Sequence, residues 1–236
     1  MAILEAEGLT KVYEEGGSRV EALRGVSLGL DPGEIVLLEG PSGSGKTTLM
    51  SVAGCLLSPT SGRLSVEGRT VDFSSTEDMV RVRRESIGFI FQSFNLFPAL
   101  TVLENVLYAL QVRGRRTPEY EREARMILDQ IGLGHRLDFI PAKLSGGEKQ
   151  RVAIARALSG GSRIVFADEP TANLDSHVGL EVLEIFRKLA KEEGRAVLVA
   201  THDSAVRKVA DWVLKIRDGQ VIEEGPPVTD LEKGHP

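Results

Sequence analysis

The segment GPSGSGKTT, residues 40 to 48, follows directly on an apolar run and combines three glycines with a lysine and two threonines. Gly40, Gly45, Lys46 and Thr47 complete the pattern G-x-x-x-x-G-K-[ST], in which backbone N–H groups cradle phosphates at the start of a helix. A plain strand-to-helix turn would explain the glycines alone, because glycine adopts positive φ without strain. We therefore expect phosphate binding here, with the Lys46 ammonium on the terminal phosphates and the Thr47 hydroxyl on Mg²⁺.

Two adjacent carboxylates, Asp168 and Glu169, end the apolar stretch IVFADEP. The carboxyl end of a strand is where open α/β sheets place their ligands. An aspartate there can hold Mg²⁺ through water, and a neighbouring glutamate can activate the water that attacks a phosphate. The alternative is a solvated pair at a strand end. The phosphate loop favours the functional interpretation.

A second candidate anion site is LSGGEKQRVAIARAL, residues 144 to 158. Ser145 can cap a helix, and Gly146 and Gly147 leave backbone N–H groups open at its positive end. A capped amphipathic helix would explain the serine and the apolar positions. It would not explain two glycines in the first turn, each of which costs about 1 kcal/mol relative to alanine.

These segments require an α/β fold to position them. The stretches ILEAEGLTKVY and VEALRGVSLGL alternate in polarity and predict an N-terminal antiparallel β layer. EIVLLEG, SIGFIFQ, RIVFADEP and AVLVATHD are short, apolar and rich in β-branched residues, which is typical of strands buried on both faces of a mostly parallel sheet. The stretch WVLKIRDGQVIEEG predicts a hairpin that turns at Asp218 and Gly219.

An inserted α-helical subdomain is expected between the second and third parallel strands. Thr117 and Pro118 would begin a helix in which Glu121 and Arg125 pair, and Gly132 would end it; its apolar stripe consists of Ala124, Ile127, Leu128 and Ile131. We therefore divide the single domain 1–236 into a nucleotide-binding core with its β layer, residues 1–92 and 159–236, and a helical subdomain, residues 93–158.

The composition is that of a globular protein without a membrane span. Of the 236 residues, 42% are hydrophobic and 27% are charged. No stretch is long and apolar enough to cross a bilayer, and the N-terminus does not have the pattern of a signal peptide. The formal net charge of -5 gives no overall reason to expect nucleic-acid binding. Cys55, the single cysteine, is expected to pack on the helix after the phosphate loop.

In their order, these motifs resemble the ATP-binding cassette (ABC) family: GPSGSGKTT, Gln92 in IFQS, LSGGEKQR, IVFADEP, ANLD at 172 to 175 and His202 in VATHD. The resemblance covers essentially the whole chain, and LSGG upstream of the Asp-Glu strand is nearly diagnostic. FNLFPALTVLENV and LSGGEKQRVAIARAL look most like the macrolide-export, lipoprotein-release and cell-division group (MacB/LolD type). Glu148 departs from the commonest signature, which has glutamine there, and we expect this change to be harmless.

The resemblance implies a set of site residues for ATP and Mg²⁺. Glu169 would be the general base, with His202 and Gln92 completing the catalytic group, and Mg²⁺ would lie among Thr47, Gln92 and Asp168. Nucleotide contacts would come from Tyr13, Gly40, Ser42, Gly43, Ser44, Gly45, Lys46, Thr47, Thr48, Ser145, Gly146, Gly147 and Asp175. Tyr13 matches an adenine-stacking aromatic, although a tyrosine packed beside a strand is the competing interpretation.

The resemblance also implies an ATPase with two partners. Two cassettes would close head to tail, so that each ATP lies between the glycine loop of one and the LSGG helix of the other. An integral membrane transporter subunit would dock near FNLFPALTVLENV, with Phe94 and Leu96 in the contact. It would hold the chain, otherwise cytoplasmic, at the inner face of the membrane. The rival functions are a soluble cassette ATPase acting on ribosomes or DNA, and a small-molecule kinase, which would not need LSGG.

Overall fold

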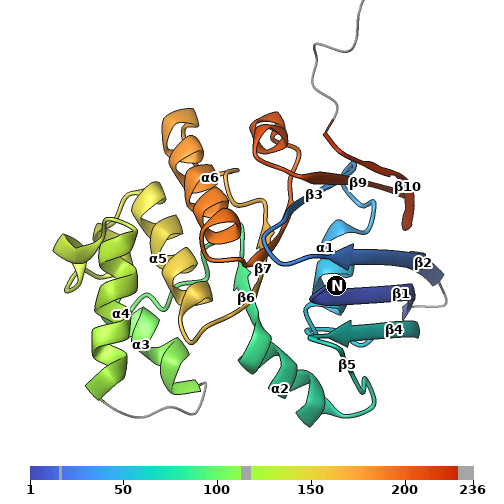
Figure 1. The fold of residues 1–236 in the computed structure, drawn as a ribbon, viewed down its shortest axis with the longest axis horizontal. Coiled ribbons are helices and arrows are strands. Elements are labelled where there is room, and N and C mark those ends of the chain that lie inside the picture. The colour runs from blue at the N-terminus through green and yellow to red at the C-terminus, as the bar shows by residue number, and fades with distance from the viewer. Residues whose placement is uncertain (16–17, 113–117, 228–236) are drawn as a thin grey trace, which may run out of the picture.

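Two sheets organise the chain, of which the computed structural model describes residues 1–15, 18–112 and 118–227 (Figure 1). The first sheet has the order β2-β1-β4-β5 and is antiparallel. Its strands are Ser18–Leu30, Leu4–Glu15, Ser61–Val66 and Arg69–Thr70. The expected N-terminal antiparallel layer is therefore confirmed.

The second sheet has the order β10-β9-β3-β8-β7-β6. Neighbours from β9 to β6 run parallel, and β10 is antiparallel to β9. Its strands, in that order, are Gln220–Gly225, Trp212–Arg217, Ile35–Glu39, Ala196–Ala200, Ile164–Asp168 and Ile87–Ile90. The mostly parallel sheet predicted from the four apolar stretches is confirmed, and so is the hairpin at Asp218 and Gly219, which both have positive φ.

The inner strands are apolar throughout because both of their faces are buried. In β3, Val36 and Leu38 belong to a core shared with the antiparallel sheet. Ile35 and Leu37 face the other way, into a core closed by α5 and α6. This packing holds the carboxyl ends of β3, β7 and β8 at one edge of the sheet.

Six α-helices surround the sheets in the described part of the chain: α1 Lys46–Ala53, α2 Thr76–Ser86, α3 Val102–Val112, α4 Pro118–Gln130, α5 Gly146–Leu158 and α6 Ser176–Lys191. Short 3₁₀ helices cover Gly134–Arg136, Pro141–Lys143 and Ser204–Lys208. Among these residues, no helix has both the length and the apolar character needed to cross a bilayer.

Helices α3, α4 and α5 lie next to one another (Figure 1). They share a third apolar cluster, distinct from the two sheet cores. The predicted stripe of α4 packs there, with Ala124 and Leu128 fully buried. Arg125 pairs with Glu121, and Gly132 takes positive φ just after the helix. The predicted cap at Thr117 lies outside the described residues.

Helix α5 joins this helical cluster to the core. Val152 and Ala155 pack in the helical cluster, whereas Ile154, Ala157 and Leu158 pack against the sheet. The division at residue 158 stays our proposal, because one helix contributes to both sides of it.

The placement of Cys55 on α1 is wrong. The helix ends at Ala53, and Cys55 follows its C-cap Gly54 with a φ of 56°. The side chain is buried, and this burial raises the pKa of the thiol to about 12. Cys55 is therefore a packed, unreactive side chain at neutral pH.

Candidate functional site

A cavity of about 560 Å³ opens where β3, β7 and β8 end. The glycine loop and the start of α1 contribute Gly40, Pro41, Ser42, Gly43, Gly45, Lys46, Thr47 and Thr48. The ends of neighbouring strands contribute Gln92, Asp168, Glu169 and His202, and β2 contributes Ala22. Residues far apart in the sequence thus line one space, as expected for parallel strands that end at one edge.

The loop can approach other backbone closely only because it is built from glycine. Gly45 is the N-cap of α1 with a φ of 107°, and Gly43 has a φ of 76°. A Cβ on Gly40 would lie 2.2 Å from the Ile216 carbonyl oxygen, and a Cβ on Gly45 would lie 2.6 Å from that of Ala22. The glycines therefore meet both a conformational and a steric requirement.

Lys46 extends along the loop. Its Nζ donates to the carbonyl oxygens of Gly40 at 2.6 Å and Pro41 at 3.1 Å. The ammonium thus lies over the loop in the cavity, where it can meet an anion.

Ser44, one of the predicted contacts, does not line the cavity. Its side chain is buried, and its hydroxyl has no hydrogen-bond partner within the described chain. The backbone turns this side chain inward, under the loop, so a phosphate contact through the hydroxyl does not fit the geometry.

A candidate Mg²⁺ site lies at the start of α1. The Thr47 hydroxyl donates to the Asp168 carboxylate at 3.1 Å, and Gln92 lines the same cavity. Burial raises the pKa of Asp168, and the Thr47 hydrogen bond lowers it in part. Hydroxyl, carboxylate and amide oxygens are the hard ligands that Mg²⁺ takes from proteins, so these residues fit the ion.

The side chain of Glu169 is held from two sides. Its backbone adopts a φ of 47°, and its N–H donates to the Ala200 carbonyl at 2.8 Å. Thr201 donates its hydroxyl to one carboxylate oxygen at 2.8 Å, and His202 Nδ1 lies 2.9 Å from the other. A carboxylate fixed in this way, beside a phosphate loop, is suited to orient and deprotonate a water.

Gln92 begins a loop that is tied to distant elements. Asn173 donates to the Gln92 carbonyl at 2.9 Å. Arg156 on α5 donates to the carbonyls of Phe94, at 2.9 Å, and Asn95, and both of these residues have positive φ. Sequence reasoning missed Arg156, Asn173 and Thr201. Only Thr201 had a usable signal, a hydroxyl at the end of an apolar strand.

The LSGG segment has the expected cap. The Ser145 hydroxyl accepts from the Glu148 N–H at 3.2 Å, and the Glu148 carboxylate accepts from the Ser145 N–H at 2.8 Å. This reciprocal pair is a capping box. Arg136 adds an ion pair to Glu148 at 2.8 Å. Together, the Ser145 N–H, the Ser145 hydroxyl and Arg136 hold the pKa of Glu148 below its usual range.

Packing explains one of the two signature glycines. A Cβ on Gly147 would lie 2.3 Å from a methyl carbon of Val178 on α6, whereas a Cβ on Gly146 would meet nothing closer than 3.4 Å. From the sequence we expected that a capped helix would not explain the two glycines. For Gly147 this expectation is wrong, because packing against Val178 leaves no room for a side chain. Nothing in the packing around Gly146 explains a glycine at that position.

The capping box leads to a stability prediction. Glu148→Ala should lower the free energy of unfolding by about 1 kcal/mol, because the Ser145 N–H loses its acceptor. Glu148→Gln, which keeps an acceptor oxygen, should lose less. Urea denaturation at pH 7 would measure both. The lowered pKa means that the contribution is present above the ordinary carboxyl pKa and is lost as the pH falls, so the alanine deficit should shrink below about pH 4.

Besides Ser44, five predicted nucleotide residues lie outside the cavity. Ser145, Gly146 and Gly147 are not among its lining residues, nor are Asp175 and Tyr13. Asp175 caps α6 by accepting from the His177 and Val178 N–H groups at 3.1 and 3.0 Å. Tyr13 lies on β1, with the Lys11 ammonium 5.3 Å from its ring centre. The structure of one chain thus separates the two segments that the sequence predicts to bind phosphate.

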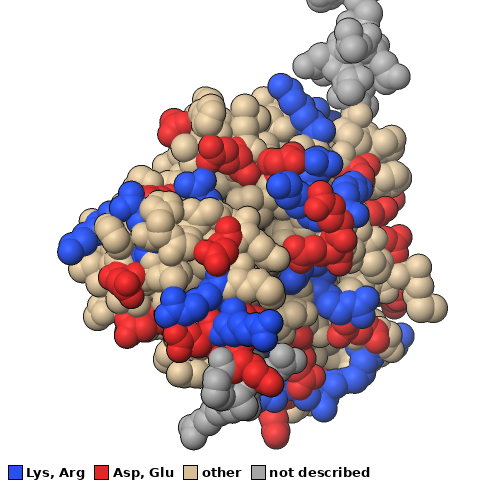
Figure 2. Space-filling model, turned by 60° about the vertical axis from the view of Figure 1, so that its left-hand side comes forward, with Lys and Arg blue, Asp and Glu red and all other residues tan. Residues whose placement is uncertain are grey.

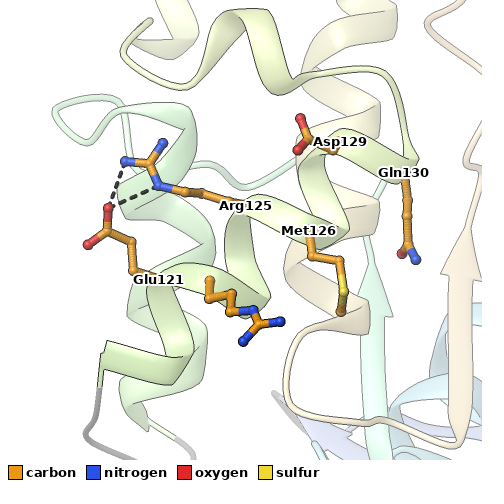
Figure 3. Close-up of a pocket in the computed structure, with 6 residues that line it drawn as sticks. Glu121, Arg125, Met126, Asp129 and Gln130 are labelled. Carbon is orange, nitrogen blue, oxygen red and sulfur yellow. Dashed lines mark hydrogen bonds and ion pairs between the residues drawn. The ribbon is translucent and has the colours of Figure 1, made fainter.

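A second hollow, of about 550 Å³, lies on α4 (Figure 3). All six of its lining residues come from that helix, and Glu121 and Arg125 are paired with each other across part of it. It has no glycine-rich backbone and no strand-end carboxylates. We assign it no chemistry.

Comparison with known proteins identifies relatives over most of the chain. A family model described as ABC transporter matches residues 23–172. An uncharacterised ABC transporter ATP-binding protein of Thermotoga maritima is 45% identical over 219 residues, covering 93% of each chain. The macrolide export ATP-binding/permease protein MacB of Syntrophobacter fumaroxidans is 43% identical over 98% of this chain, which spans 33% of that relative.

Solved structures agree with this fold. One described as a dimeric bacterial ABC transporter cassette has a TM-score of 0.88 and 37% identity, covering 96% of this chain and 99% of its own. A post-hydrolysis state of that cassette, bound to ADP and Pi, has the same TM-score of 0.88.

Proposed function

The chain belongs to the ABC transporter family, and on this premise we propose that the cavity at the end of β3 is its ATP site. The chain is an ATP-binding and ATP-hydrolysing cassette of that family. One observation carries the site assignment: the glycine loop, the Thr47–Asp168 pair and Glu169 line a single cavity.

The proposed mechanism relies on positioning and charge. The loop N–H groups and Lys46 hold the phosphates, and Glu169 takes a proton from the attacking water while His202 and Thr201 keep its carboxylate in place. Thr47, Gln92 and Asp168 would hold Mg²⁺, which neutralises charge on the phosphates. In a neutral His202 ring whose Nδ1–H forms the hydrogen bond to Glu169, Nε2 carries no proton and can only accept. A hydrogen bond from Nε2 to a phosphate therefore requires a ring that is protonated on both nitrogens.

A second copy of the chain is the proposed partner in catalysis. Ser145, Gly146 and Asp175 lie outside the cavity, and the Ser145 end of α5 presents N–H groups, as an anion site requires. A head-to-tail dimer would bring this end over the ATP of the other copy. The likeness to a dimeric cassette supports this arrangement. Independently of the dimer, we propose that Tyr13 stacks on adenine.

We further propose that the cassette drives an integral membrane transporter subunit and is held by it at the inner face of the membrane. The MacB relative combines ATP-binding and permease in its name, which supports a membrane partner of this type. The face in Figure 2 carries interspersed charges of both signs rather than a field of one sign. Because no field of one sign stands out there, we take the docking contact to be apolar rather than electrostatic.

The apolar segment after Gln92 provides such a contact. Asn105 is fully buried, and its amide oxygen accepts a hydrogen bond from the Phe97 N–H at 2.8 Å. Its amide nitrogen donates to the carbonyls of Phe97, Leu100 and Thr101. The loop thereby presents Phe97, 41% exposed, against Tyr108, 46% exposed, with ring centres 4.8 Å apart. From the sequence we expected Phe94 and Leu96 to make the contact, but Leu96 packs against the helical cluster, so Phe97 is the better position to test.

The docking face gives a prediction. Phe97→Asp should lower recovery of the membrane partner by about 30-fold, the loss of one interface hot spot, while basal ATPase stays unchanged. Ile222→Asp, at an exposed position on β10, is the matched control and should retain the partner. Equal recovery with both variants would contradict the docking assignment.

The function itself can be tested by capture. A tagged chain carrying Glu169→Gln, held with ATP and Mg²⁺, would be recovered from detergent-solubilised membranes of its host. We expect an integral membrane transporter protein to accompany it, and to be lost with Phe97→Asp. Recovery of ribosomal or DNA-associated proteins, with no membrane protein, would overturn the transport role and leave the ATPase assignment standing.

A further inference from the structure

The tip of the β9–β10 hairpin touches the phosphate loop. The Gly219 N–H donates to the Ser44 carbonyl at 3.0 Å, and the Arg24 N–H donates to the Gly219 carbonyl at 2.8 Å. A Cβ on Gly219 would lie 2.8 Å from the Ala22 carbonyl oxygen. The turn thus fits between β2 and the loop, where only glycine leaves room.

A hydrogen bond to the Ser44 carbonyl fixes the orientation of one peptide unit of the phosphate loop. A peptide unit is planar and trans, so its C=O and its N–H point in opposite directions. The carbonyl of Ser44 and the N–H of Gly45 belong to one peptide unit. When Gly219 holds that carbonyl, the Gly45 N–H must point away from the hairpin, and Gly45 lines the cavity.

Two further features restrict the same peptide. A Cβ on Gly45 would lie 2.6 Å from the Ala22 carbonyl oxygen, the atom that Gly219 also approaches. The Ser44 side chain is buried. The loop therefore has little freedom to turn this peptide once the hairpin is in place.

The chain contains a second turn of the same kind without these contacts. Glu67 and Gly68 join β4 to β5 with φ values of 51° and 76°, and Asp218 and Gly219 join β9 to β10 with 48° and 77°. A Cβ on Gly68 would meet nothing within 4 Å. Gly68 is exposed, whereas Gly219 is buried.

We propose that Gly219 is a positioning residue of the nucleotide site: its N–H fixes the Ser44–Gly45 peptide so that the Gly45 N–H faces the phosphates. This inference rests on the proposed ATP site. The β9–β10 hairpin then contributes to phosphate binding, although it lies far from the phosphate loop in the sequence.

The test compares two alanine variants at positions with nearly the same positive φ. Gly219→Ala and Gly68→Ala both place an alanine at positive φ, so both should lose some stability. Only Gly219→Ala should weaken binding of Mg·ADP, by about tenfold, the effect of one misdirected charge-assisted hydrogen bond. Calorimetric titration below both melting temperatures measures this, and Gly68→Ala should bind like the unaltered chain. Equal affinity of the two variants would overturn the inference.

A measurement on the unaltered chain covers the case in which Gly219→Ala does not fold. Mg·ADP should slow hydrogen exchange of the Gly219 amide and leave that of the Gly68 turn unchanged. An equal response of both turns would overturn the inference alone. If neither the unaltered chain nor Gly68→Ala binds Mg·ADP, the proposed ATP site is wrong, and this inference falls with it.

Discussion

Replacing Glu169 by glutamine should leave ATP binding intact while lowering ATP hydrolysis by a factor of about 10² to 10⁴. That factor corresponds to about 3 to 5 kcal/mol in activation free energy. Glutamine keeps the shape of the side chain but replaces one carboxylate oxygen by an NH2 donor. Its remaining oxygen can accept from the Thr201 hydroxyl, and its NH2 can donate to His202 Nδ1 when that nitrogen carries no proton; these partners lie 2.8 and 2.9 Å from the carboxylate. Glutamine cannot accept the proton from the attacking water.

Phosphate release and size-exclusion chromatography with ATP would measure the effect. The closed dimer should accumulate, because hydrolysis no longer reopens it. Glu67→Gln is a suitable control: Glu67 also has positive φ, and its carboxylate accepts a hydroxyl hydrogen bond at 2.8 Å, from Ser86. That variant should turn over normally. Normal turnover of Glu169→Gln instead would remove Glu169 from the role of general base.

Replacing Lys46 by alanine should act on binding rather than on the chemical step. Charge-assisted hydrogen bonds contribute about 1.5 to 3 kcal/mol, so ATP affinity should fall by about 10- to 150-fold. The Nζ group also bridges the Gly40 and Pro41 carbonyls at 2.6 and 3.1 Å. Its loss should therefore loosen the loop as well as remove the charge.

Calorimetric titration with a non-hydrolysed ATP analogue would measure the loss. Lys191→Ala is the matched control, since Lys191 also donates to a glycine carbonyl, that of Gly33 at 3.0 Å, and does not line the cavity. Its affinity should be unchanged. An unchanged affinity of Lys46→Ala would argue against phosphate contact by this lysine.

Local patterns made much of this fold and site predictable. The cap formed by Ser145, the turn at Asp218 and Gly219 and the glycine loop before α1 all depend on residues within a few positions of each other. Strands buried on both faces also leave a clear mark, a continuous apolar run. Fold class, motif placement and the family resemblance therefore followed from the sequence.

The remaining features depend on contacts between distant residues, for which the chain carries no local signal. Thr47 meets Asp168 across 121 positions, and Gly219 reaches the Ser44 carbonyl. The same packing turns the Ser44 side chain inward and makes Gly147 necessary beside Val178. By itself, the sequence determined which residues could bind phosphate and which elements carry them. The tertiary structure decided which of them share one cavity, because only close packing brings strand ends and hairpin tips from distant segments together.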